Sequence, residues 1–144
     1  MLPGRTPALN DPLSITAAAR EAGGRTALCL GAQRYTFAEL AERAQALRAQ
    51  LAPDPQRPYA LVGSNTLDTA VTLYALLDAR VPVLVLHPKL TEAERHAEIE
   101  ATAQAADALP ADVAAILYTS GTTGRARGAV LTRSALLASA QANA

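Results

Sequence analysis

The segment from Tyr118 to Gly128, YTSGTTGRARG, holds the residues best suited to chemistry in this chain. Three glycines and four hydroxyl side chains lie between positions 119 and 128. Glycine lets a backbone approach a ligand closely and turn successive N–H groups inward, which forms an anion-binding concavity. The hydroxyls add donors, and the guanidinium groups of Arg125 and Arg127 suit phosphate oxygens. The segment predicts a polyphosphate site, and the alternative is an exposed flexible loop of the same composition.

Two common nucleotide-binding patterns do not fit this segment. Counting five residues on from Gly121 reaches Ala126, and no Gly-Lys-Ser/Thr follows, so the P-loop pattern fails. The dinucleotide-binding pattern G-x-G-x-x-G is also missing. These mismatches argue against assigning the protein to the P-loop NTPases, the kinases or the dinucleotide-binding enzymes.

The elements that would position this segment alternate between strand and helix. Apolar periodicity, proline and glycine positions, and capping boxes at Thr36–Glu39 and Thr91–Glu94 locate their ends. Such alternation indicates βαβ units and an α/β fold with a mainly parallel sheet. The predicted helices are 14–22, 36–51, 67–80, 91–106 and 132–142, and the predicted strands are 26–30, 33–35, 59–63, 81–86, 113–118 and 128–131.

Local details of these elements are also predicted. Gly23-Gly24, which tolerate left-handed backbone angles, are predicted to stop the first helix, and Gly31-Ala32 to turn a hairpin. Pro82 marks the start of a buried strand. The alanine-rich stretch 101–115 is either a linker or a helix followed by a strand.

Potentially reactive side chains outside this segment are interpreted as structural or surface residues. Cys29 lies in an apolar run and is predicted to be a small core residue. His87 is interpreted as a capping or surface residue and His96 as a solvated one. Asp78 is assigned no role. No His, Cys or carboxylate residues have metal-ligand spacing, so no metal site is predicted.

Composition and charge disfavour several classes of partner. The chain has 144 residues, 50% of them hydrophobic, with a formal net charge of zero. Neutral charge and 3% aromatic residues disfavour nucleic acid as a partner. No apolar stretch reaches the ~20 residues of a membrane span, and the first residues do not resemble a secretion signal. A cytoplasmic location is predicted.

The phosphate-type segment resembles the signature of the adenylate-forming superfamily, Tyr/Phe-Thr-Ser-Gly-Thr-Thr-Gly-x-Pro-Lys-Gly. Positions 118–124 agree without exception, and Gly128 falls in register. YTFAEL at Tyr35–Leu40 is similar to the family's early helix start, and Leu73–Arg95 to its helix and strand ending in "Pro-leu-asn-pro-x-leu-thr-x-x-Glu". VLTRSALLASAQANA, at the carboxyl end, resembles the helix after the signature. The resemblance spans the chain from about Ser14 onward.

The resemblance implies the large N-terminal domain of an AMP-forming acyl ligase. Residues 1–13 would be a tail, and 14–144 an incomplete domain without the C-terminal lid domain. The implied ligands are ATP, Mg²⁺, a carboxylic acid, and CoA or another thiol acceptor. The residues implied to bind the ATP phosphates are Thr119, Ser120, Gly121, Thr122, Thr123, Gly124, Arg127 and Gly128.

Departures from the family pattern are confined to a few positions. Arg127 stands where the family has lysine, and Ala126 where it has proline. Residues 132–135 read TRSA where the family often has Thr-His-x-Asn. The short interval between Leu90 and the signature favours the 2-succinylbenzoate–CoA ligase branch.

The family's catalytic elements follow the signature, and none of them occurs in these 144 residues. We therefore assign no catalytic residue and expect the isolated chain to be inactive. We expect the chain either to pair with a second chain that completes the enzyme or to associate with itself. The alternative is a non-catalytic remnant or interaction module that keeps the fold.

Overall fold

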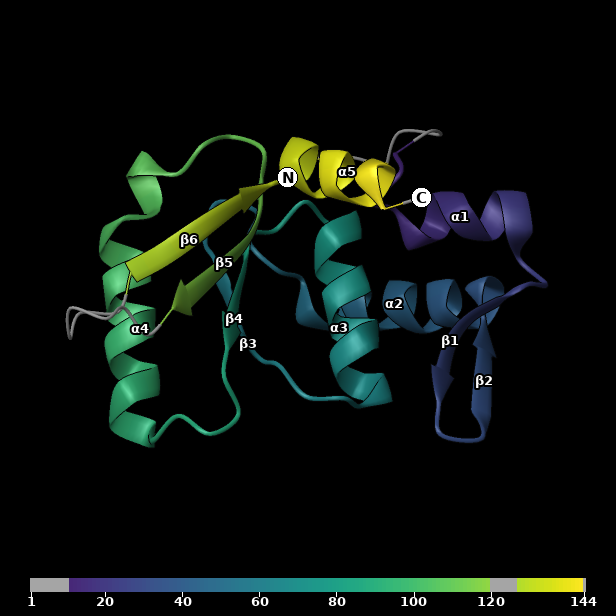
Figure 1. The fold of residues 1–144 in the computed structure, drawn as a ribbon, viewed down its shortest axis with the longest axis horizontal. Coiled ribbons are helices and arrows are strands. Elements are labelled where there is room, and N and C mark those ends of the chain that lie inside the picture. Colours follow the sequence, from purple (N-terminus) through teal and green to yellow (C-terminus); the bar gives the residue numbers. More distant parts are fainter. Residues whose placement is uncertain (1–10, 120–126, 144) are drawn as a thin grey trace. The chain divides into compact units, whose positions relative to one another are not determined.

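The computed structural model describes residues 11–119 and 127–143 of the chain (Figure 1). The described residues fall into two compact units. Unit 1 falls within Met1–Pro53 and Asn65–Ala79. Unit 2 falls within Asp54–Ser64 and Arg80–Ala144. No helix among the described residues is both long and apolar enough to cross a membrane.

Unit 1 is three helices with a small β-hairpin. Helices α1 (Ile15–Ala22), α2 (Phe37–Leu51) and α3 (Leu67–Asp78) pack together, and strands β1 (Thr26–Leu30) and β2 (Gln33–Thr36) form the hairpin. The apolar faces of the helices bury one core, made of Ile15, Leu40, Ala41, Ala44, Val71 and Ala75.

Side-chain caps fix where these helices begin. Ser14 accepts the Ala17 backbone N–H with its Oγ, 3.1 Å away, and so caps α1. Thr36 and Glu39 form the predicted capping box of α2, in which each side chain accepts the other residue's backbone N–H. Such reciprocal bonds satisfy donors that the first helical turn leaves unpaired.

Helix α1 ends at Ala22, directly before Gly23, as predicted. Gly23 has φ −50°, so the helix does not end through a left-handed glycine there. A Cβ at Gly23 would lie 2.7 Å from the Ala19 carbonyl oxygen, closer than real Cβ atoms approach. Lack of a side chain, and not a positive φ, is what this position requires.

The hairpin confirms the predicted turn but overturns the interpretation of Cys29. Gly31 has φ +59°, which glycine adopts freely at the turn. The strand pairing shifts register between Thr26 and Leu28, and Ala27 and Leu28 both pack against the core. Strand alternation after this irregularity turns Cys29 away from the core. Cys29 is exposed, so the prediction of a core residue was wrong.

Ala52 gives a test of local backbone strain in unit 1. It caps α2 in the left-handed region, with φ 40° and ψ 54°, a conformation that costs residues with a Cβ roughly 1–2 kcal/mol. We expect Ala52→Gly to raise the free energy of unfolding by about 1 kcal/mol, measured from urea unfolding followed by circular dichroism. Ala79, the cap of α3, has φ −78° and ψ −6°. Ala79→Gly is the matched control and should lower stability by roughly 0.5–1 kcal/mol. Shifts of the same sign would contradict this account.

Unit 2 is a four-stranded sheet with one antiparallel edge. The strands β3 (Tyr59–Val62), β4 (Val83–Leu86), β5 (Val113–Thr119) and β6 (Arg127–Thr132) follow in that order. The pairs β3–β4 and β4–β5 are parallel, and β5–β6 is antiparallel. A connection as short as 120–126 cannot make the crossover that parallel pairing needs. The prediction of a mainly parallel sheet is confirmed.

One face of this sheet carries the core of unit 2. Leu84, Leu86, Val113 and Ile116 are buried together. Helix α4 (Glu92–Gln104) contacts β4 and continues through the 3₁₀ turn η1 (Ala106–Ala108). The alanine-rich stretch is therefore a helix followed by a strand and not a linker. Helix α5 (Arg133–Ala142) begins at its cap, Thr132, directly after β6.

Candidate phosphate-binding site

The structure places three of the eight predicted phosphate-binding residues. Thr119 ends β5, and Arg127 and Gly128 begin β6. The other five, Ser120, Gly121, Thr122, Thr123 and Gly124, lie outside the described residues. The site is therefore built here from the two strand ends that carry the first and last residues of the signature.

Thr119 and Arg127 lie directly opposite each other in the antiparallel β5–β6 pair. Directly opposed residues of such a pair point their side chains to the same face of the sheet. The Thr119 hydroxyl also donates to the Arg127 carbonyl oxygen at 3.4 Å. Both residues are exposed, so a hydroxyl and a guanidinium group are presented together to solvent. This pair of groups suits a phosphate.

The preceding pair, Tyr118 and Gly128, is turned the other way. A Cβ on Gly128 would lie 3.4 Å from the Tyr118 Cζ atom, so the phenol ring lies against the glycine. The Tyr118 hydroxyl is 3.2 Å from Oγ1 of Thr102, a buried residue of α4. Since successive residues of a strand face opposite sides, the side chains of Thr119 and Arg127 lie on the other face from the Tyr118 ring. Thr119, as the last residue of β5, also borders a cavity beside α4.

The site lies at the carboxyl end of two neighbouring parallel strands. Strand β4 ends at Leu86 and β5 at Thr119, and the two run parallel. Ligands of open α/β sheets bind outside the carboxyl ends of the strands. The signature is therefore attached where this architecture ordinarily binds its ligands.

A cavity of about 490 Å³ adjoins this strand end. Hydrogen bonds from Thr91 lower the pKa of Glu94, and burial, followed by repulsion from Glu94, raises the pKa of Glu98. Negative charge beside Thr119 disfavours this cavity as the phosphate position. The cavity is lined by His87, Leu90, Glu94, Ala97, Glu98, Tyr118 and Thr119.

The two histidines behave as their sequence context predicts. Nδ1 of His87 accepts the Lys89 backbone N–H at 3.1 Å, and the side chain is exposed, so His87 caps a turn. His96 is exposed on α4. Among the described residues, no group of three or more His, Cys, Asp or Glu side chains could hold a metal ion.

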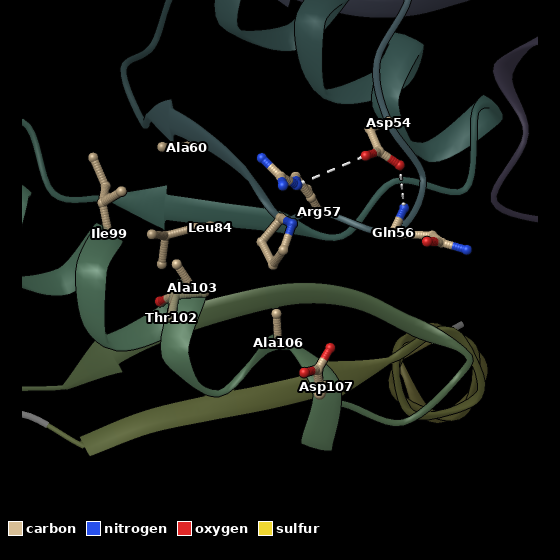
Figure 2. Close-up of a pocket in the computed structure, with 11 residues that line it drawn as sticks. Asp54, Gln56, Arg57, Ala60, Leu84, Ile99, Thr102, Ala103, Ala106 and Asp107 are labelled. Atoms are coloured by element: carbon tan, nitrogen blue, oxygen red, sulfur yellow. Dashed lines mark hydrogen bonds and ion pairs between the residues drawn. The ribbon is translucent and has the colours of Figure 1, made fainter.

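A second cavity of unit 2 lies at the other end of the sheet. Its volume is about 620 Å³, and it opens between the segment before β3 and the carboxyl-terminal half of α4 (Figure 2). Leu84 and Ala60 form its apolar floor, and Asp54, which contacts Arg57 at 3.9 Å, stands at the rim. Its position near the amino ends of β3 and β4 separates it from the signature.

Comparison with known proteins identifies the architecture. Residues 96–144, from α4 through the signature to the end of the chain, match the family described as AMP-binding enzyme. A double mutant of o-succinylbenzoate CoA synthetase (MenE) from Bacillus subtilis, bound to the product analogue OSB-NCoA, superposes with a TM-score of 0.78. That match covers 90% of this chain at 21% identity. The fold is that of the N-terminal part of the adenylate-forming enzymes.

Two further solved structures have a similar fold. The B. subtilis synthetase in complex with ATP and magnesium ion matches 82% of this chain, with a TM-score of 0.71 and 21% identity. The N-terminal subdomain of Klebsiella oxytoca NpsA matches 83%, with a TM-score of 0.67 and 16% identity. This chain spans 35%, 42% and 41%, respectively, of the three matched chains. No curated protein matches its sequence.

The structure also reveals a residue that sequence reasoning did not select. Thr102 lies 16 positions before Tyr118 in an alanine-rich helix, and no motif marks it. Only the packing of α4 on the sheet brings its hydroxyl to the strand that precedes the signature. No signal within the sequence could have paired these two residues.

Proposed function

We propose that this chain is the ATP-phosphate-binding part of an AMP-forming ligase. Such an enzyme activates a carboxylic acid as acyl-AMP and passes the acyl group to a thiol such as CoA. The observation that supports this most is the match of residues 96–144 to the AMP-binding enzyme family. That segment contains the whole signature, attached at the carboxyl end of β5.

The proposed role of the chain is to bind the triphosphate. Residues Thr119–Gly124, together with Arg127 and Gly128, would hold the β- and γ-phosphates through amide, hydroxyl and guanidinium donors. A carboxylate that attacks the α-phosphate must approach a polyanion, and fixed donors and cations reduce that repulsion. When bound with ATP, Mg²⁺ supplies further neutralisation of phosphate charge. The exposed Thr119 and Arg127, on one face of the sheet, fit this role.

The 2-succinylbenzoate–CoA ligase branch is the proposed subgroup. The short interval between Leu90 and the signature favours it. Similar structures include the B. subtilis o-succinylbenzoate CoA synthetase with ATP and magnesium ion and with the product analogue OSB-NCoA. The proposed compartment is the cytoplasm.

Catalysis is proposed to need residues beyond this chain. The resemblance places the adenine-contacting motif, the ribose-binding aspartate and the catalytic lysine after the signature. The 144-residue chain is therefore expected to give no exchange of pyrophosphate into ATP with any carboxylic acid. A longer polypeptide or a second chain would supply the missing groups.

Phosphate binding by the chain itself is the direct test. The 144-residue chain would be titrated calorimetrically with inorganic tripolyphosphate, Mg·ATP and adenosine at low ionic strength. Because the proposed contacts reach only phosphates, tripolyphosphate and ATP should bind with affinities within about threefold of each other, roughly 0.7 kcal/mol. Adenosine should not bind.

The outcomes separate the two candidate functions. Binding of both phosphates, weakened by added salt, supports the ligase assignment because exposed charge contacts are screened. If neither phosphate binds at millimolar concentration, the phosphate-binding role is wrong. A non-catalytic module that keeps the fold would then be the better account.

A further inference from the structure

A hydrogen-bonded clamp joins α4 to the strand end that bears the signature. The clamp consists of Thr102, Tyr118 and Gly128, all of which lie in the part of the chain that the structure describes. Thr102 is only 3% exposed, and its hydroxyl donates to the Glu98 carbonyl oxygen at 2.8 Å. A threonine hydroxyl has one hydrogen. Tyr118 must therefore be the donor in its 3.2 Å contact with Thr102.

The Tyr118 ring connects this bond to the second strand. Tyr118 and Gly128 are directly opposed in the β5–β6 pair, and the ring atoms lie 3.4–3.7 Å from where a glycine Cβ would be. A long or branched side chain at position 128 would displace the ring from this position. Both strand ends are thus held against α4 by one aromatic side chain.

The Tyr118 ring and the side chains of Thr119 and Arg127, which are proposed to contact phosphate, lie on opposite faces of the same strands. Tyr118 points to the α4 face, and its neighbour Thr119 points to the other face with Arg127. A rotation of the strand end that released Tyr118 from Thr102 would therefore also turn Thr119 and Arg127. Donors that are fixed before a ligand arrives bind it more tightly, because less ordering is needed on binding.

We propose that Thr102 and Tyr118 are positioning residues, which hold Thr119 and Arg127 in the orientation that binds a phosphate chain. This inference rests on the proposed function, because its consequence is phosphate affinity. Neither residue touches the phosphate. Thr102 acts only through Tyr118.

The test uses the full 144-residue chain and inorganic tripolyphosphate as the probe. Thr102→Val removes the acceptor with little change of shape, and Tyr118→Phe removes the donor. Each should weaken tripolyphosphate binding by about three- to tenfold, the ordinary effect of one hydrogen bond. Thr102→Ser keeps the hydroxyl and should bind within about twofold of the unchanged chain, a rescue that general loosening of the core would not give.

A double-variant cycle separates positioning from unrelated losses. Since both substitutions break the same bond, Thr102→Val/Tyr118→Phe should bind no more than about twofold more weakly than either single variant. Additive losses would overturn the clamp. Amide hydrogen exchange of residues 113–119, measured without phosphate, should be faster in Tyr118→Phe than in the unchanged chain. Unchanged exchange would also overturn the clamp.

The failures of the two proposals can be told apart. If the unchanged chain binds no tripolyphosphate, the proposed function fails, and the exchange measurement still tests the clamp. If the unchanged chain binds and all variants bind equally well, only the clamp fails.

Discussion

Replacing Arg127 with alanine is expected to weaken binding of tripolyphosphate and Mg·ATP by about tenfold. Arg127 is exposed at the start of β6, with its side chain on the same face as Thr119. A hydrogen bond between charged groups contributes about 1.5–3 kcal/mol, and screening in solvent favours the lower end of this range. Calorimetric titration of the 144-residue chain measures the change.

Two further substitutions show whether the effect belongs to this position. Arg127→Lys keeps the charge but loses the planar fork, and it should bind within about threefold of the unchanged chain. Arg57→Ala makes the same change in net charge in the same unit, at a side chain that is 86% exposed and contacts only Asp54 among the ion pairs described. It should alter affinity by less than about twofold. An equal loss in Arg57→Ala and Arg127→Ala would mean that binding follows net charge and not the signature.

Replacing Leu40 with alanine is expected to cost unit 1 about 3 kcal/mol of stability. Leu40 is fully buried in α2, among Ile15, Ala41, Ala44 and Val71. Truncation removes apolar contact and leaves a cavity, since the neighbouring side chains relax only partly. Leucine and alanine have similar helix propensities, so the loss would report packing and not helix formation.

Leu47 in the same helix is the matched control. It is only partly buried and packs at the margin of the same core. Leu47→Ala should therefore cost about half as much as Leu40→Ala, or less. Urea unfolding and amide exchange of α2 and α3 would measure both variants. A cost for Leu47→Ala that equals the cost for Leu40→Ala would show that burial is not the cause.

Local chemistry made most elements of this fold predictable. The capping boxes at Thr36–Glu39 and Thr91–Glu94 fixed the starts of two helices because the hydrogen bonds that form them join residues three apart. The turn at Gly31 was likewise readable, because few residues other than glycine adopt its φ of 59°. Patterns of this kind need no knowledge of distant parts of the chain.

The sequence predicted the environments of individual side chains less well than it predicted helices and turns. Cys29 lies in an apolar run, yet a register irregularity that no local pattern marks turns it outward. Asp78 received no role, but it is 3% exposed and accepts a hydrogen bond from Thr16, 62 positions away. The partner of Asp78 lies far along the chain, and the outward position of Cys29 depends on how β1 pairs with β2.

The sequence alone determined that this protein has an α/β fold with a phosphate-type signature after a buried strand, because short-range periodicity and glycine-rich composition encode both. Only the tertiary structure decided which face of the strand end carries Thr119 and Arg127, and that Tyr118 reaches Thr102 behind them. The physical reason is that strand register and helix packing join residues distant in sequence. No local pattern specifies such pairs.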